Sequence, residues 1–394
     1  MQFQPLYEAH VLPTYGRYPV SFAKGKGSRL WDAEGKEYID FMSGIGVNAV
    51  GHSHPQWVAA VADQAALLAH TSNLYMTRPG AELAQRLCQI SGMARVFFAN
   101  SGAEANEGMF KVARKYSSTK YNTQARGTIL SLAQSFHGRT MATLTATGQP
   151  DKFHHSFYPF PAGYRHVPAG DVSALEAQGD DVCALLIEPI QGEGGVQPLD
   201  AAYVKAAAEI CRQRDWLLLV DEVQTGMGRT GEWFGFQHFD ITPSVISFAK
   251  GIAGGLPMGG FMVSEALASV LGPGDHGTTF GGNLICAAAA LATLDILTPV
   301  LPSVSQKGEA IRNRILAMNI PAVADVRGKG LMLGVQLNEG TSPAEVNAAL
   351  LQNGLAGLTA GTDILRFMPP LTIAQADIDA GLEIFEQTMK ARPQ

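Results

Sequence analysis

Residues 216–250 read WLLLVDEVQTGMGRTGEWFGFQHFDITPSVISFAK and contain two short apolar runs. WLLLV (216–220) leads directly into Asp221, and VISFA (245–249) leads directly into Lys250. Continuous apolar runs of this length, bounded by turns, are typical of strands that are buried on both faces of a sheet. The stretch therefore predicts a parallel α/β sheet that carries a carboxylate and a lysine at adjacent strand ends.

Three more apolar runs alternate with helical stretches and extend the same sheet: RVFFA (95–99), TILSL (128–132) and ALLIE (184–188). Residues 28–41 read as a hairpin around a D-A-E-G turn, residues 325–337 as a second strand pair, and residues 374–389 as the last helix. We expect an N-terminal segment (1–45) that belongs to a smaller α+β domain. A large domain with a mostly parallel central sheet should span residues 46–285, and the rest of the smaller domain residues 286–394.

Composition and charge exclude several classes of protein. The 394 residues carry a net charge of −6 without a long run of either sign, so the electrostatic footprint of a nucleic-acid binder is missing. The 4 cysteines form no Cys-x-x-Cys pair, which argues against a zinc cluster or a disulfide scaffold and suits a reducing cytoplasm. The N-terminus lacks the pattern of a secretory signal. Residues 277–294 are uncharged, but their apolar part is too short to span a bilayer and predicts a buried helix.

Polar residues follow each of the five apolar runs. Exposure of strand ends explains any one of them, but it explains poorly why Asp221 and Lys250 each follow a fully apolar run and precede a glycine-rich loop. Ligands of open parallel sheets bind outside the carboxyl ends of the strands, so we expect these groups to converge on one site. They are Asn100–Ala103, Phe136–Arg139, Glu188, Asp221 and Lys250.

Residues 97–116 read as a strand, a tight turn and a helix. Ser101 and Glu104 have the spacing of a capping box, so a simple helix cap is one interpretation. The other is a phosphate cradle, in which Ser101, Gly102 and Ala103 present backbone N–H groups at the positive end of the helix.

Other motifs are weaker. GMGRTG (226–231) matches G-x-G-x-x-G, but residues 241–264 contain no acidic residue and no clear helix follows, so we reject NAD binding. GKGS (25–28) and RGKG (327–330) lack the spacing of a P-loop. The histidines of GHSHP (51–55) and the pair at 154–155 lack a third ligand at suitable spacing, and we expect no metal site.

Lys250, Asp221 and the phosphate cradle together suggest a specific chemistry. A buried lysine is held in its neutral, nucleophilic form, and a carboxylate from an adjacent strand end can keep a pyridine nitrogen protonated. With a helix N-terminus for a phosphate, these are the contributions that a protein makes to pyridoxal phosphate chemistry.

Nine blocks, in order from about residue 15 to the C-terminus, resemble the class III (ω-amino acid) aminotransferases of fold type I, and within them the acetylornithine aminotransferases. The blocks are SNLY (72–75), FFANSGAEANE (97–107), SFHGRT (135–140), IEPIQGEGG (187–195), LLLVDEVQTGMGRTG (217–231), FAKGIAGGLPMGG (248–260), TTFGGN (278–283), RGKGLMLG (327–334) and LRFMPPL (365–371). The resemblance implies the pyridoxal-phosphate transferase fold, with the cofactor bound in the large domain.

The resemblance also implies roles for residues around the cofactor. Lys250 attaches the cofactor and then serves as the base for the proton shift, while Asp221 pairs with the pyridine nitrogen. The remaining cofactor contacts are Ser101, Gly102 and Ala103 at the phosphate, Phe136 and Val223 on the two ring faces, Gln224 near the ring hydroxyl, and Thr279 at the phosphate of the neighbouring subunit.

For the substrate, the resemblance implies that Arg139 takes the distal carboxylate and Arg366 the α-carboxylate of glutamate. Glu193 pairs with Arg366 when an ω-amine occupies the site and swings away for glutamate; an ordinary structural ion pair is the alternative. An isoleucine at position 45, as Ile45 here, looks more like the acetylornithine or 4-aminobutyrate enzymes. Tyr15, by contrast, aligns with a tyrosine that contacts the substrate carboxylate in ornithine aminotransferases.

The implied activity is transfer of the δ-amino group of N2-acetyl-L-ornithine to 2-oxoglutarate, within arginine biosynthesis, by a cytoplasmic homodimer that binds neither nucleic acid nor membranes. The related alternatives are succinylornithine, ornithine and 4-aminobutyrate aminotransferases. A glutamate-1-semialdehyde aminomutase would need no external amino acceptor, and a non-catalytic binding homologue would keep only the fold.

Overall fold

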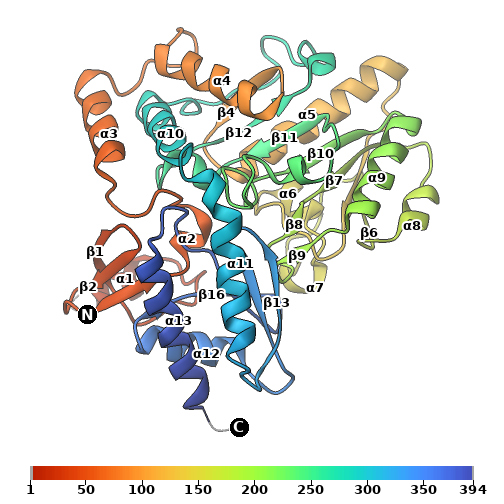
Figure 1. Ribbon diagram of the computed structural model, residues 1–394. Coiled ribbons are helices and arrows are strands. Elements are labelled where there is room, and N and C mark those ends of the chain that lie inside the picture. Colours follow the sequence, from red (N-terminus) through yellow and green to blue (C-terminus); the bar gives the residue numbers. More distant parts are fainter. Residues whose placement is uncertain (1–2, 393–394) are drawn as a thin grey trace.

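The computed structural model describes residues 3–392 and divides into a large sheet domain and a smaller unit beside it (Figure 1). The large sheet has seven strands in the order β4-β12-β11-β10-β7-β5-β6. Strand β12 runs antiparallel to both of its neighbours, and the other pairs are parallel. Their bounds are β4 Arg95–Ala99, β5 Thr128–Leu132, β6 Tyr164–Val167, β7 Val182–Ile187, β10 Leu217–Asp221, β11 Val245–Phe248 and β12 Gly259–Val263.

The five strands predicted from apolar runs are confirmed, and β6 and β12 are the two that the runs did not reveal. Strand β6 (YRHV) lies at the sheet edge and is mostly polar. Strand β12 begins with two glycines because neighbouring backbone leaves no room for side chains. A Cβ on Gly259 would lie 2.6 Å from the carbonyl oxygen of Ser101, and one on Gly260 would lie 2.3 Å from that of Phe97.

Helices cover both faces of this sheet, which explains why its strands are continuously apolar. Leu218 and Val220 of β10 belong to a core that also contains residues of α4 (Arg78–Ser91), α9 (Ala201–Arg214) and α10 (Leu284–Leu297). Leu217 and Leu219 point to the opposite face and pack with residues of α5 (Gly102–Tyr121).

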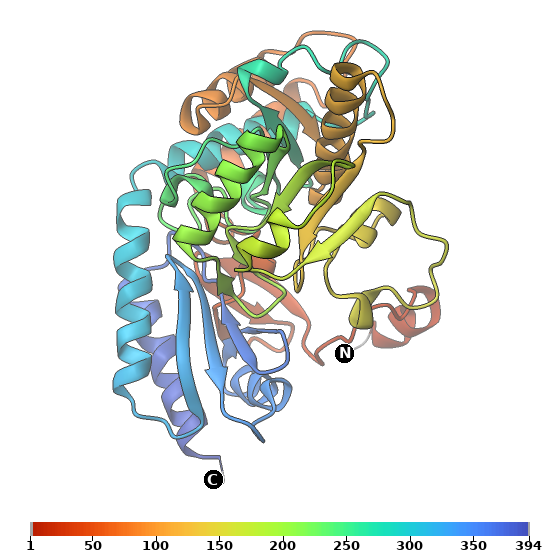
Figure 2. The same cartoon turned by 90° about the vertical axis from the view of Figure 1, so that its right-hand side faces the viewer.

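The smaller unit combines the two ends of the chain (Figure 2). The predicted hairpin forms β2 (Arg29–Asp32) and β3 (Glu37–Asp40), and β3 pairs in parallel with β15 (Leu355–Ala356). The predicted C-terminal strand pair and last helix are also present. The elements of the C-terminal part are α11 Leu301–Ala317, β13 Val323–Lys329, β14 Met332–Leu337, α12 Pro343–Gln352, β16 Leu358–Ala360, β17 Ile364–Phe367 and α13 Gln375–Lys390.

The remaining elements are short or connect the two units. They are α1 Gln4–His10, β1 Phe22–Lys26, α2 Ser43–Gly46, α3 Pro55–Leu67, α6 Met141–Ala146, α7 Pro150–Phe153, α8 Val172–Glu176, β8 Ile190–Gln191, β9 Gln197–Pro198, and the 3-10 helices η1 Gly235–His238, η2 Lys250–Ala253 and η3 Glu265–Leu267.

The expected domain boundary at residue 285 falls within the first turn of helix α10. Ala287, Ala290 and Leu294 pack in the core of the large sheet, whereas Ile296 and Leu297 pack in the core of the smaller unit. We therefore propose that the large domain includes α10 and that the smaller domain resumes just after it. No single helix within residues 3–392 has the length and apolar content needed to cross a membrane; α10 and α11 meet that test only as a pair bent by 68°.

Candidate active site

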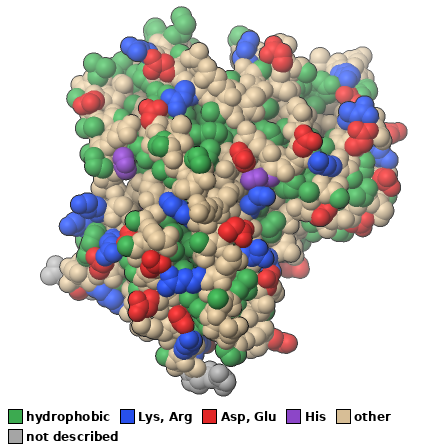
Figure 3. Space-filling view, viewed as in Figure 1, with side chains coloured by type: hydrophobic (Ala, Val, Ile, Leu, Met, Phe, Trp, Pro, Cys, Tyr) green, Lys and Arg blue, Asp and Glu red, His purple; other side chains and the backbone are tan. Residues whose placement is uncertain are grey.

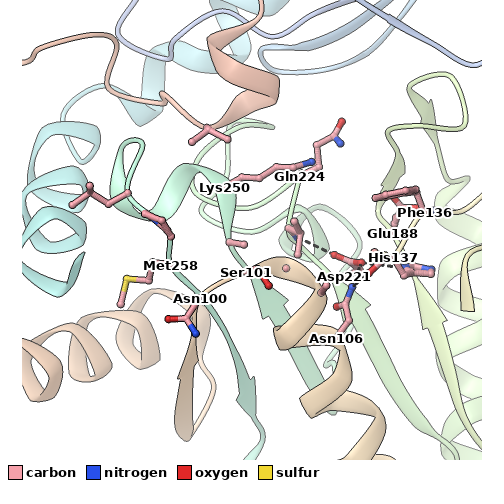
Figure 4. A pocket seen from close by; sticks show the side chains of 18 of the residues that line it. Asn100, Ser101, Asn106, Phe136, His137, Glu188, Asp221, Gln224, Lys250 and Met258 are labelled. Carbon is pink, nitrogen blue, oxygen red and sulfur yellow. Dashed lines mark hydrogen bonds and ion pairs between the residues drawn. The ribbon is translucent and has the colours of Figure 1, made fainter. Parts of the chain in front are cut away.

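A cavity of about 340 Å³ opens at the carboxyl edge of the large sheet (Figure 4). All five predicted strand-end groups contribute to its wall, so the expected convergence is confirmed for the cavity. The contributing residues are Asn100, Ser101, Gly102 and Ala103 after β4, Phe136, His137 and Gly138 after β5, Glu188 after β7, Asp221 at the end of β10, and Lys250 after β11. Asn106, Val223, Gln224 and the loop of Gly255–Met258 complete much of the lining.

Lys250 has the properties of a nucleophilic amine. It is the first residue of η2 and adopts the left-handed conformation with φ of +43°, a strained state that recurs at functional sites. Burial lowers the pKa of its ammonium group to about 8, although the charge of Glu193 acts in the opposite direction. A substantial fraction of the side chain is therefore neutral near physiological pH and can attack a carbonyl carbon.

Asp221 is a buried carboxylate with four hydrogen-bond donors. Its Oδ2 accepts from Asn106 at 2.7 Å and contacts His137 Nδ1 at 2.8 Å. Its Oδ1 accepts from the Val223 N–H at 3.0 Å and from the Ser247 hydroxyl at 3.2 Å. Burial alone would raise the pKa of Asp221, but His137 and these donors outweigh it and hold the pKa below its usual value. The group stays ionised and can pair with a protonated ring nitrogen.

Three of the donors to Asp221 received no role from the sequence. Asn106 and His137 lie within recognised blocks, and Ser247 lies in the apolar run of β11. Buried polar residues in such runs are a signal that they have a partner, but the sequence does not identify the partner.

Ser101, in the turn after β4, caps helix α5, and the N-terminal end of this helix lines the cavity. Ser101 Oγ accepts from the Glu104 N–H at 3.2 Å, as predicted. The Glu104 carboxylate, however, accepts from the N–H of Asn100 at 2.6 Å instead of that of Ser101, so the capping box is not the standard reciprocal one. Gly102 lies against Val223, whose Cγ1 would be 2.8 Å from an added Cβ. First-turn N–H groups have no carbonyl partner within a helix, so this end can bind an anion.

These groups fit pyridoxal phosphate. One cavity holds an amine with a lowered pKa, an ionised carboxylate and the N-terminus of the 20-residue helix α5. Phe136 and Val223 reach the cavity from the loops after β5 and β10, respectively, which suits contacts to two faces of a flat ring. The Phe136 N–H is held by Glu188 Oε2 at 3.0 Å, and burial raises the pKa of Glu188 to about 7.

Arg366 and Glu193 form an ion pair next to the cavity, 173 positions apart in the chain. Arg366 Nη1 donates to Glu193 Oε1 at 2.5 Å and to Gln224 Oε1 at 3.2 Å. Burial would raise the pKa of Glu193, but Arg366 outweighs burial and lowers it. Arg366 is 3% exposed, and its Nε has no partner among residues 3–392. Part of a buried guanidinium is thus available to a further acceptor.

Besides Glu193 and Arg366, four more predicted residues do not line the cavity. The Arg139 guanidinium lies over the ring of Phe153 at 4.3 Å and farther from that of Phe136, at 5.5 Å. Tyr15, Ile45 and Thr279 are exposed on this chain. Their roles, like those of the other site residues, stay predictions.

Comparisons with known proteins show what this chain is similar to. A family model described as "Aminotransferase class-III" matches residues 12–389. An acetylornithine aminotransferase from Haemophilus ducreyi is 46% identical over 98% of this chain and 98% of its own length. The crystal structure of N-acetylornithine aminotransferase from Stenotrophomonas maltophilia is 34% identical, with a TM-score of 0.85 and 98% of each chain covered. An ornithine aminotransferase structure from Toxoplasma gondii, with partial occupancy of PLP at its active site, is 31% identical, with a TM-score of 0.94 and 99% and 93% of the two chains covered.

Proposed function

This chain belongs to the class III aminotransferases, which depend on pyridoxal phosphate, and on that premise we propose that it transfers the δ-amino group of N2-acetyl-L-ornithine to 2-oxoglutarate. The products are N-acetyl-L-glutamate 5-semialdehyde and L-glutamate, and the pathway is arginine biosynthesis. Acetylornithine aminotransferases that are 42–46% identical over nearly the whole chain support this choice of substrate.

The observation that carries the proposal is the Glu193–Arg366 ion pair, which lies near enough to Lys250 for both charges to act on the pKa of its amine. The two substrates of such an enzyme differ at the reacting carbon: glutamate has a carboxylate next to its amine, and the δ-carbon of N-acetylornithine has none. Arg366 binds that carboxylate when glutamate reacts. When the ω-amine reacts, Glu193 neutralises Arg366, because an unpaired buried cation costs several kcal/mol.

The side chains divide the remaining work. Bound pyridoxal phosphate supplies a carbonyl group for the substrate amine and an electron sink for the bond that breaks. Lys250, once free, takes a proton from the amine-bearing carbon of the substrate. Asp221 stays ionised and holds a proton at the ring nitrogen. Ser101, Gly102 and Ala103 hold the phosphate, and Arg139 receives the distal carboxylate of either substrate.

We also propose a cytoplasmic homodimer, in which Thr279 of each subunit reaches the phosphate in its partner's site. Exposed apolar side chains near the loop of Thr279 and around α3 support such an interface, because large exposed apolar groups commonly mark protein contacts. They are Leu67, Leu74, Tyr75, Met76 and Phe280, each at least 61% exposed. Acidic and basic side chains are interspersed over the face seen in Figure 3.

A half-reaction scan tests the proposed substrate. N-acetylornithine, succinylornithine, ornithine and 4-aminobutyrate are added separately to the holoenzyme without a keto acid, and the visible cofactor band is followed. We expect rapid loss of the band with N-acetylornithine and slow loss with the other three. Rapid loss only with one of the others would assign that substrate instead. A chain that cannot be reconstituted with pyridoxal phosphate would refute the proposed reaction.

A further inference from the structure

The loop Gly226–Gly231, whose GMGRTG sequence resembles a nucleotide motif, forms the joint between the two domains. Gly228 and Gly231 have φ angles of +83° and +98°, which only glycine adopts easily. A Cβ on Gly231 would lie 2.0 Å from Ser305 Oγ of α11, and one on Gly330 would lie 2.5 Å from the carbonyl carbon of Thr230. The loop therefore packs against the smaller domain with no space for additional side-chain atoms.

Arg229 is the buried centre of this joint, with 2% of its surface exposed. Its Nη1 donates to the carbonyl oxygens of Leu331 at 2.9 Å and Pro369 at 2.6 Å. The Leu331 N–H in turn donates to the Arg229 carbonyl at 3.0 Å. The guanidinium thus binds backbone of the smaller domain directly.

The two carbonyls belong to opposite positions of one strand pair. Strands β14 and β17 are antiparallel, with Leu333 opposite Phe367 and Gly334 opposite Arg366. The same register, continued by two residues, brings Leu331 opposite Pro369. Arg229 therefore binds the backbone of both strand segments at one end of the β14–β17 pair. Pro369 is only three residues from Arg366.

The same segment of the large domain contacts β17 a second time, since Gln224 Oε1 accepts from Arg366 Nη1 at 3.2 Å. Residues 221–231 thus extend from Asp221 in the cavity, past Arg366, to Arg229 and its hydrogen bond with the Pro369 carbonyl. We propose that Arg229 is a positioning residue that sets the place of β17, and so of Arg366, relative to Lys250. This inference rests on the proposed role of Arg366 as the carboxylate-binding residue.

The two half-reactions should depend differently on Arg229. Binding of a carboxylate by a guanidinium requires accurate geometry, so a small displacement of β17 weakens the grip of Arg366 on glutamate. The ω-amine substrate places no carboxylate on Arg366 and tolerates the displacement. A general loss of stability would instead slow both half-reactions.

The test compares Arg229→Lys with the wild-type holoenzyme. Lysine keeps the positive charge, but its Nζ lies one bond nearer to the backbone than the arginine Nη1 that donates to both carbonyls, so it cannot reach them in the same geometry. We expect the glutamate half-reaction to lose about tenfold or more in its second-order rate constant, as for loss of one hydrogen bond to a charged group, while the N-acetylornithine half-reaction changes by less than about threefold. The Kd of glutarate, an unreactive dicarboxylate, should rise in parallel in a calorimetric titration.

Arg126→Lys is the matched control. Arg126 is also mostly buried and also donates to backbone carbonyls, those of Arg214 and Asp215, but it lies within the large domain. The control should leave both half-reactions and glutarate binding unchanged. Thermal midpoints of both variants report any general loss of stability.

Equal losses in the two half-reactions of Arg229→Lys, or no change in glutarate binding, would overturn the inference. A failure of this inference can be distinguished from an error in the proposed amine substrate. If N-acetylornithine does not react with the wild type, the best alternative amine takes its place, and glutamate and glutarate still report on Arg366.

Discussion

At the scale of single residues, the lowered pKa of Lys250 gives a measurable pH dependence. Its folded pKa of about 8 lies below the ordinary value for lysine, so the neutral amine dominates above pH 8 and the ammonium form below it. The rate at which the apoenzyme binds pyridoxal phosphate should fall about tenfold per pH unit below 8 and level off above it. Stopped-flow absorbance between pH 6.5 and 9.5 measures this rate.

Two results would contradict this assignment of Lys250. One is a rate that keeps rising towards pH 10, as expected for an ordinary lysine. The other is a normal turnover in Lys250→Ala, which should abolish transamination without loss of the apoenzyme's thermal stability, because burial disfavours the charged amine in the fold.

Glu193 tests the switch against an ordinary ion pair. In Glu193→Ala, Arg366 has no carboxylate partner when the ω-amine is bound, whereas glutamate still provides one. The rate constant of the N-acetylornithine half-reaction should therefore fall by a factor about ten times larger, or more, than that of the glutamate half-reaction. Single-turnover kinetics with each substrate give the ratio, and Glu193→Gln shows how much of it depends on charge. Equal losses would favour the structural ion pair.

At the scale of elements, strand β12 depends on its glycines. In Gly260→Ala the new Cβ would meet the Phe97 carbonyl oxygen at 2.3 Å and the Phe248 ring at 2.6 Å, so the sheet must open between β4, β12 and β11. We expect a loss of about 2 kcal/mol or more in the free energy of unfolding. Gly277→Ala is the control, because nothing lies within 4 Å of its added Cβ. Chemical denaturation that gives the two variants equal stability would contradict the packing described for β12.

At the scale of the whole molecule, the exposed apolar residues and Thr279 predict that the active unit is a dimer. Light scattering on the holoenzyme should give the mass of two 41.9-kDa chains. Charged substitutions at Leu74 and Met76, which are 89% and 104% exposed, should produce monomers that bind pyridoxal phosphate more weakly. The same substitutions at exposed Leu316 of α11 are the control. A wild-type monomer with full activity would rule out the role of Thr279.

Much of the large domain could be predicted from sequence because its elements are coded locally. A strand covered by helices on both faces must be apolar throughout, and parallel strands share one carboxyl edge, so WLLLV and VISFA identified both the strands and the place of Asp221 and Lys250. Strand β12 escaped prediction because its sequence, GGFMV, is dictated by close neighbouring backbone. A buried helix was predicted within residues 277–294, but the continuation of α10 to Leu297 and its packing in two cores were not.

The sequence by itself determined five of the seven strands of the sheet, the converging strand ends and, through its motifs, the class of chemistry. Only the tertiary structure decided which distant groups meet: Asn106 and His137 at Asp221, and Arg229 at the carbonyls of Leu331 and Pro369. The physical reason is that these contacts join separate segments of the chain, and a backbone carbonyl accepts a hydrogen bond whatever its side chain. No local pattern therefore records such a partner, and the joint within GMGRTG becomes visible only when the two domains are packed together.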